Sequence, residues 1–242
     1  MNKFLNTVAL ICSVTFVPAQ VNAADTVWNF NPYKSKLSLN NQGYGNELTT
    51  TQNKQTLNIT AWSGTDYGAI AGSKISANEA GLLNYNKIQK GYSKDSHYID
   101  NAYSNDMLLF SFDDSVSVSG LSLGYTHNDH DLSVAAFHSI PLLSGNTWAN
   151  VASQAIFTKS FSNTEFSNSN TLSFSNVATE AKYWLIGAYN SNFGGNSIWS
   201  KENDYMKLLT LTTHYAPSAS VPAPASAFLF ALLGLVALRR RH

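Results

Sequence analysis

The sequence is short of several residue types, and each shortage excludes a class of site. Its single cysteine, Cys12, lies inside an apolar run near the N-terminus. If that run is removed on export, no disulfide, zinc–cysteine site or catalytic thiol remains. A body of about 200 residues can still be held together by a hydrophobic core alone.

Arginine is confined to the end of the chain, at Arg239, Arg240 and Arg241. The whole chain carries 15 basic and 15 acidic residues, and losing Lys3 and the three arginines would leave a net charge near −4. Arginine is the preferred side chain for forked recognition of phosphates and base edges. An acidic body without arginine therefore argues against a nucleic-acid partner. The chain also lacks a phosphate-binding loop and a His-Glu-x-x-His zinc motif.

Residues 1–23 have the pattern of a secretory signal peptide. Lys3 supplies the positive start, residues 4–17 are mostly apolar, and Val21 and Ala23 are the small residues that precede a cleavage site. We expect cleavage between Ala23 and Ala24. A buried N-terminal helix is the structural alternative.

Residues 217–242 form a second processing region with three parts. A spacer rich in proline, serine and alanine precedes an apolar stretch over residues 225–238 and the arginines at 239–241. Fourteen helical residues reach only about 21 Å against a hydrocarbon layer of about 30 Å, which is marginal for a permanent span but sufficient for a transient stop. The arginines would hold the end in the cytoplasm, and Pro222 and Pro224 keep the spacer extended.

This tail resembles the PEP-CTERM sorting signal of Gram-negative bacteria. The motif lies at Val221, Pro222, Ala223 and Pro224, with Ala223 where the family usually has glutamate. The resemblance implies an exosortase-type enzyme as partner and cleavage near the motif. It implies a protein that is tethered in the membrane during sorting and then reaches the cell surface or the extracellular matrix. An ordinary single-span anchor is the alternative.

Residues 24–216 alternate polar and apolar side chains in short runs, which is the period of β-strands. We expect an all-β body, an antiparallel jelly-roll-like β-sandwich, because many short strands are separated by turn residues. The predicted strands cover residues 27–39, 55–62, 69–75, 107–112, 116–125, 132–137, 153–161, 171–177, 183–189 and 205–214.

Parts of the body resemble a group of exosortase-dependent surface proteins. The resemblance rests on Asp100-Asn101 before the strand at 106–113, the loop at 128–131, and the segments 183–190 and 204–208. It implies a surface location and no particular biochemical activity.

The loop His127-Asn-Asp-His-Asp131 is the most ligand-like cluster in the sequence. Asp129 and Asp131 offer oxygen ligands for Ca²⁺ in an extracellular setting, whereas His127 and His130 would favour a transition metal. A plain turn is the alternative, because aspartate and asparagine also favour turns through hydrogen bonds to their own backbone.

The tryptophans suggest a second kind of site. Trp148 and Trp199 lie among glycine, asparagine and serine, so their rings could stack on sugars, including an exopolysaccharide of the matrix. Trp184 lies in an alternating strand and is expected in the core. We expect a non-enzymatic structural or adhesive surface protein, with a carbohydrate-binding module as the alternative. A secreted glycan hydrolase, using a pair among Glu165, Glu180 and Glu202, is a third possibility.

Overall fold

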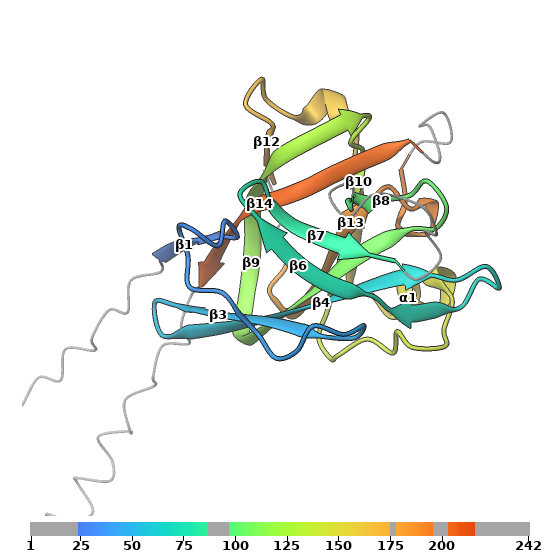
Figure 1. Cartoon of the computed structure of the whole chain (residues 1–242), viewed down its shortest axis with the longest axis horizontal. Helices are drawn as coiled ribbons and strands as arrows, with labels where there is room; N and C mark the ends of the chain where they lie inside the picture. Colours follow the sequence, from blue (N-terminus) through green and yellow to red (C-terminus); the bar gives the residue numbers. More distant parts are fainter. Residues whose placement is uncertain (1–23, 87–96, 175–177, 196–202, 216–242) are drawn as a thin grey trace, which may run out of the picture. The chain divides into compact units, whose positions relative to one another are not determined.

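The computed structural model describes residues 24–86, 97–174, 178–195 and 203–215. This part of the chain folds mostly as β-strands, which join into one antiparallel, nearly closed sheet (Figure 1). The predicted all-β class is therefore confirmed. Contacts gather the described residues into one compact unit. None of the helices in the described ranges is long and apolar enough to cross a membrane.

The strands are β1 (Ala24–Asn29), β2 (Ser38–Leu39), β3 (Glu47–Gln52), β4 (Gln55–Gly64), β5 (Ile70–Gly72), β6 (Lys74–Asn78), β7 (Gly81–Tyr85), β8 (Ile99–Asp100), β9 (Asp106–Asn128), β10 (Leu132–Phe137), β11 (Phe157–Phe161), β12 (Thr171–Ser173), β13 (Ala181–Ala188) and β14 (Asp204–Tyr215). The helical elements of the described residues are short: α1 (Trp148–Ala152), η1 (Asn163–Glu165) and η2 (Ser191–Phe193).

Strand β9 organises the sheet, because its two halves pair with different neighbours. Its first half, up to Phe112, pairs with β4 on one side. On the other side, β13 pairs with β9 between Met107 and Val116. Its second half, from Ser117 to Asn128, pairs with β14, and β12 adds to it at residues 120–122. The long strand crosses the centre of Figure 1 and brings its own C-terminal end beside the start of β14.

The first half of β9 is buried on both faces. Leu108 and Phe110 point into the main core, whereas Met107 and Leu109 belong to a second cluster together with Trp148 of α1. The six residues of β10 are also all buried. A continuous apolar run, rather than a strict alternation, is what a strand covered on both faces requires.

Several predicted strands have different bounds in the structure. The turn expected at residues 113–115 is absent, because β9 runs through it as one strand while changing partners. The predicted strand at 153–161 begins only at Phe157. The strand predicted at 171–177 ends at Ser173, and residues 175–177 lie outside the described residues. Residues 27–39 divide into β1 and β2, and residues 69–75 contribute to β5 and β6. The prediction missed β3, β7 and β8.

Candidate metal centre

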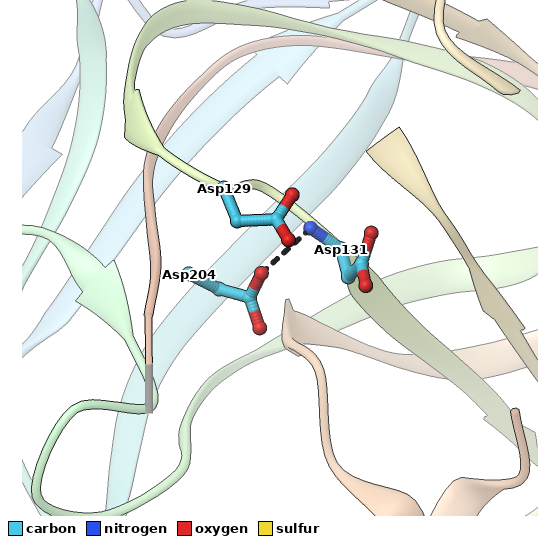
Figure 2. A group of neighbouring side chains, drawn as sticks. All are labelled: Asp129, Asp131 and Asp204. Carbon is cyan, nitrogen blue, oxygen red and sulfur yellow. Dashed lines mark hydrogen bonds between the residues drawn. The ribbon is translucent and has the colours of Figure 1, made fainter. Parts of the chain in front are cut away.

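Three aspartates meet where β9 ends and β14 begins. Asp129 follows β9, Asp131 precedes β10, and Asp204 is the first residue of β14. One carboxylate oxygen from each lies within 4.8 Å of the others. In Figure 2 the carboxyl groups of Asp129 and Asp204 lie next to each other and beside the backbone nitrogen of Asp131, whose own carboxyl group points away from the pair. Asp204 lies 73 residues after Asp131, so the fold adds a distant carboxylate to two near neighbours.

The backbone places Asp129 against the start of β14. Asn128 has a φ of 56°, a left-handed conformation that asparagine tolerates better than most residues and that turns the chain out of β9. The Asp129 N–H donates to the Asn203 carbonyl at 3.2 Å, and the Tyr205 N–H donates to the Asp129 carbonyl at 3.1 Å. These bonds form a short parallel bridge between Asp129 and Asp204.

Hydrogen bonds fix the three carboxylates. The backbone N–H of Asp131 donates to Asp204 Oδ1 at 2.8 Å. Asn163, at the start of η1, donates from its backbone N–H to Asp131 Oδ1 at 2.6 Å and from its side chain to Asp129 Oδ1 at 2.5 Å. On the other side, Asn101 Nδ2 donates to Asp204 Oδ2 at 2.5 Å. These hydrogen bonds fix the positions of the three carboxylates relative to one another.

Burial and the mutual repulsion of neighbouring carboxylates disfavour the ionised forms of Asp131 and Asp204. Asp131 is 3% exposed and Asp204 is fully buried. Burial, followed by the charges of Asp131 and Asp129, raises the pKa of Asp204 to about 8. Burial also raises the pKa of Asp131, against the opposing effect of the hydrogen bond from Asn163. The ion pair found among the described residues joins His214 to Asp25 instead, at 3.0 Å.

Burial and repulsion disfavour the ionised form of three carboxylates this close, and either a retained proton or a bound cation would relieve that cost. All the grouped ligand atoms are carboxylate oxygens, which hard cations such as Ca²⁺ and Mg²⁺ prefer. The residues present therefore fit a divalent cation. When bound, it would supply positive charge that holds the ends of β9 and β14 together.

The two histidines of the loop point to other partners. The His127 ring packs against Tyr205 at a centroid distance of 5.8 Å, and the His130 ring packs edge-on against Phe166 at 4.9 Å. Burial lowers the pKa of His130, partly offset by the charge of Asp129. The oxygen-only group of Asp129, Asp131 and Asp204 thus favours Ca²⁺ over a transition metal.

Of the two tryptophans predicted to contact sugars, one is buried and the other lies outside the described residues. Trp148 is only 6% exposed, begins α1 and packs edge-on against Phe193 at a centroid distance of 6.2 Å. Its ring faces are therefore part of the second core cluster, and not of the loop surface that the sequence suggested. Trp199 lies outside the described residues. Trp184 is fully buried, as predicted.

The predicted processing residues lie at or beyond the ends of the described chain. Ala24 is the first residue of β1. Ala23, the motif Val221, Pro222, Ala223 and Pro224, and the basic tail Arg239, Arg240 and Arg241 fall outside the described residues.

The candidate catalytic groups do not form a recognisable site in the described part. Glu165 closes a capping box at η1 by accepting from the Ser162 N–H at 2.8 Å, and Glu180 is exposed. Glu202 lies outside the described residues. Gly120–Gly124 has the Gly-x-Ser-x-Gly spacing of a hydrolase elbow, but it lies within β9 and not at a strand-to-helix turn. The Ser122 hydroxyl shares a hydrogen bond with Thr210 at 2.6 Å.

Sequence reasoning missed Asp204, Asn101 and Asn163 as members of the centre. Asp204 stands directly before a predicted strand, as Asp131 does, and this shared position is the signal that could have suggested it. No family model, curated protein or solved structure matches the chain.

Proposed function

We propose that the chain is an exported surface or extracellular-matrix protein with a structural or adhesive role. In this proposal its jelly-roll-like sandwich is stabilised by Ca²⁺ at Asp129, Asp131 and Asp204. The observation that carries the proposal is that the fold brings Asp204 to the two carboxylates of one distant loop, Asp129 and Asp131. The three are held by hydrogen bonds and by no ion pair among the described residues.

The burial of the centre favours a structural ion over a catalytic one. Asp131 and Asp204 are almost fully covered, so an ion between them has little room to meet a substrate. Extracellular modules commonly bind Ca²⁺ with dissociation constants of about 10⁻⁴ to 10⁻³ M, which suits a preformed site of few carboxylates. Export would expose the body to such concentrations.

The route to the surface follows from the two ends of the sequence. Residues 1–23 direct export, and the tail at 217–242 stops in the membrane until an exosortase-type enzyme cleaves near Val221–Pro224. The body then serves in the matrix without enzymatic activity.

The ion is tested by calorimetry and thermal unfolding of the purified full chain with and without Ca²⁺. We expect saturable binding and a higher Tm with Ca²⁺, both lost in Asp204→Asn. Asp66→Asn makes the same chemical change at an exposed turn and should behave as wild type. A wild-type chain that neither binds Ca²⁺ nor gains stability from it would refute the proposal that Ca²⁺ stabilises this fold.

The route is tested separately by the intact mass of the protein recovered from cells with and without the sorting enzyme. A mass ending near residues 221–224, seen only when the enzyme is present, supports processing. A mass that retains residues 239–242 in both cases would mean an ordinary membrane anchor.

A second candidate, a carbohydrate-binding module, is favoured by a tyrosine face made of Tyr98, directly before β8, Tyr125 in β9 and Tyr205 in β14. The Tyr98 ring stacks on Tyr125 at 5.5 Å and meets Tyr205 edge-on at 5.8 Å, and Tyr125 is 41% exposed. Exposed aromatic rings of this kind stack on sugar rings. Tyr125→Ala should abolish retention on a glycan array if this face binds sugars. Tyr33→Ala, at an isolated tyrosine that is 85% exposed, should leave retention unchanged.

A further inference from the structure

Two tyrosines from opposite sides of β14 lie with their rings stacked. Tyr98 directly precedes β8, and Tyr125 lies in β9. Tyr205 of β14 pairs with Asp100 of β8 and with His127 of β9, so these two strands flank β14. The centroids of the Tyr98 and Tyr125 rings are 5.5 Å apart, and the ring planes differ by 21°. The two rings therefore meet although no pairing joins β8 to β9 among the described residues.

Side chains of β14 hold this pair of rings in place. Lys207, which lies opposite Tyr125 in the pairing of β9 with β14, places its Nζ 5.4 Å from the centroid of the Tyr125 ring and 5.2 Å from that of Tyr98. An ammonium group is attracted to the negative face of an aromatic ring. Tyr205 adds an edge-on contact to Tyr98 at a centroid distance of 5.8 Å. The stacked arrangement thus depends on three strands together.

The hydroxyl groups of the two tyrosines are also close together. Burial, followed by a side-chain hydrogen bond with Tyr125 and by the charge of Tyr125, raises the pKa of Tyr98. A hydrogen bond between two tyrosine side chains joins their hydroxyl groups. Because the rings are nearly parallel, the ring carbons next to the hydroxyl-bearing carbons also lie side by side. These are the carbons at which two tyrosyl radicals couple. Tyr125 is 41% exposed, so an oxidant in solution can reach the pair.

We propose that Tyr98 and Tyr125 form an oxidative cross-linking site, at which a haem peroxidase using hydrogen peroxide joins the two rings by a carbon–carbon bond. Each phenol first loses one electron and one proton. The two radicals couple at the carbons next to the hydroxyls, and the hydrogens on those carbons then move as protons to the oxygens, which restores both phenols. The product has lost two hydrogen atoms, and these reduce one hydrogen peroxide molecule to two water molecules.

The cross-link gives the body a covalent tie that its cysteine content does not allow. The chain has one cysteine, Cys12, so no disulfide can form within it. Positions 98 and 125 are 27 residues apart, and a bond between them fixes β8 to β9 across β14. A covalent bond that closes such a loop stabilises a protein mainly by restricting its unfolded chain. We expect the Tm of the cross-linked protein to be higher by about 5–10 °C.

The test treats the purified full chain with a haem peroxidase and hydrogen peroxide. Mass spectrometry after digestion should find two peptides joined through Tyr98 and Tyr125 and lighter by two hydrogen atoms, and the sample should show dityrosine fluorescence. Tyr98→Phe and Tyr125→Phe should each abolish this product, because phenylalanine has no phenol to oxidise. Tyr67→Phe is the control at a turn tyrosine that is 97% exposed, and it should leave the product unchanged. The result does not depend on export or on the Ca²⁺ centre, because the chain is purified and no Ca²⁺ is added.

Two results would overturn the proposal. One is a set of cross-links that join different chains through exposed tyrosines such as Tyr67, with none between Tyr98 and Tyr125. The other is a link from Tyr98 to Tyr205 in place of Tyr125, which Tyr205→Phe would abolish; if the stacked pair reacts, Tyr205→Phe keeps the product. Near-UV circular dichroism checks that each variant is folded, and Tyr125→Phe serves as the test if Tyr98→Phe does not fold.

Discussion

The side chain of Asn101 and the first residue of β14, Asp204, hold each other through two reciprocal hydrogen bonds. Asn101 Nδ2 donates to Asp204 Oδ2 at 2.5 Å, and the Asp204 backbone N–H donates to Asn101 Oδ1 at 3.0 Å. The same amide also donates to the Tyr189 carbonyl at 3.1 Å. Asn101 thus orients a candidate metal ligand and ties β14 to the segment that follows β13.

Removing this amide should lower both the stability of the fold and its affinity for Ca²⁺. We expect Asn101→Ala to lower the free energy of unfolding by about 2 kcal/mol, because a buried bond to a carboxylate is lost. Ca²⁺ affinity should fall by at least about tenfold, as for other partners of metal ligands. Urea unfolding and calorimetry measure the two effects. Asn105→Ala is the control, since its amide donates to the same Tyr189 carbonyl at 2.8 Å. Equal losses of Ca²⁺ affinity in both variants would contradict the assignment.

The stability of the Ca²⁺-free protein should fall as pH rises. The pKa of Asp204 is raised from 3.8 to about 8 on folding, so the folded protein keeps a proton that the unfolded chain releases. The resulting stabilisation is complete below pH 3.8 and is lost as pH rises through about 8. Bound Ca²⁺ should reverse this trend, because protons compete with the ion for the carboxylates.

Thermal unfolding across that pH range, in Ca²⁺-free and Ca²⁺-saturated buffer, measures the effect. Asp204→Asn should flatten the slope of the Ca²⁺-free protein. A slope that is identical in wild type and Asp204→Asn would mean that Asp204 is not the titrating group.

A methyl group at Gly187 should separate β13 from β9. A Cβ there would lie 2.2 Å from the Asp106 carbonyl oxygen and 2.6 Å from Met107 Cα, and neither backbone atom can rotate away. We expect Gly187→Ala to cost about 3 kcal/mol or more. At Gly43 the nearest atom to an added Cβ is the Asn41 side chain at 3.3 Å, so Gly43→Ala should change stability by less than about 0.5 kcal/mol. A normal Tm for Gly187→Ala would show that the two strands are not packed this closely.

Substitutions of Trp148 separate a core role from a glycan-binding role. Its ring is buried, and its Nε1 has no hydrogen-bond partner. We therefore expect Trp148→Phe to cost no more than about 1 kcal/mol and Trp148→Ala to cost about 3–5 kcal/mol. Urea unfolding measures both. A saturable glycan affinity that disappears in Trp148→Phe, with stability unchanged, would restore the prediction made from the sequence.

The sequence predicted the strand bounds correctly where a strand keeps the same partners along its whole length. Residues 132–137 were predicted with the bounds that β10 has, because the apolar run is short and flanked by polar turns. Asp113 and Asp114 misled the prediction, because a strand that bends while changing partners carries the same exposed polar residues as a turn. The strands β3 and β8 were missed: one is rich in threonine, and the other has only two residues.

Only the part of the candidate centre that lies in a single loop could be predicted from the sequence. Asp129 and Asp131 share one loop, so their spacing could suggest a cation site. Asp204 and Asn101 join them through the pairing of β14 with β9 and β8, which no local pattern encodes. Their burial, which makes the charges costly, is likewise a property of the assembled sheet.

The pairing of β1 with β14 has a mechanical consequence. Ala24 lies opposite Tyr215, and β14 is flanked along this part by β1 on one side and β9 on the other. Tension applied to the chain after Tyr215 would enter along the axis of β14. It would load many interstrand hydrogen bonds in shear at once, whereas a peeling force would break them one after another. A body held by that end would resist extension through its longest strand pairing, with Trp28 Nε1 bonded to Thr213 Oγ1 at 3.0 Å as a cross-strand tie close to the point of load.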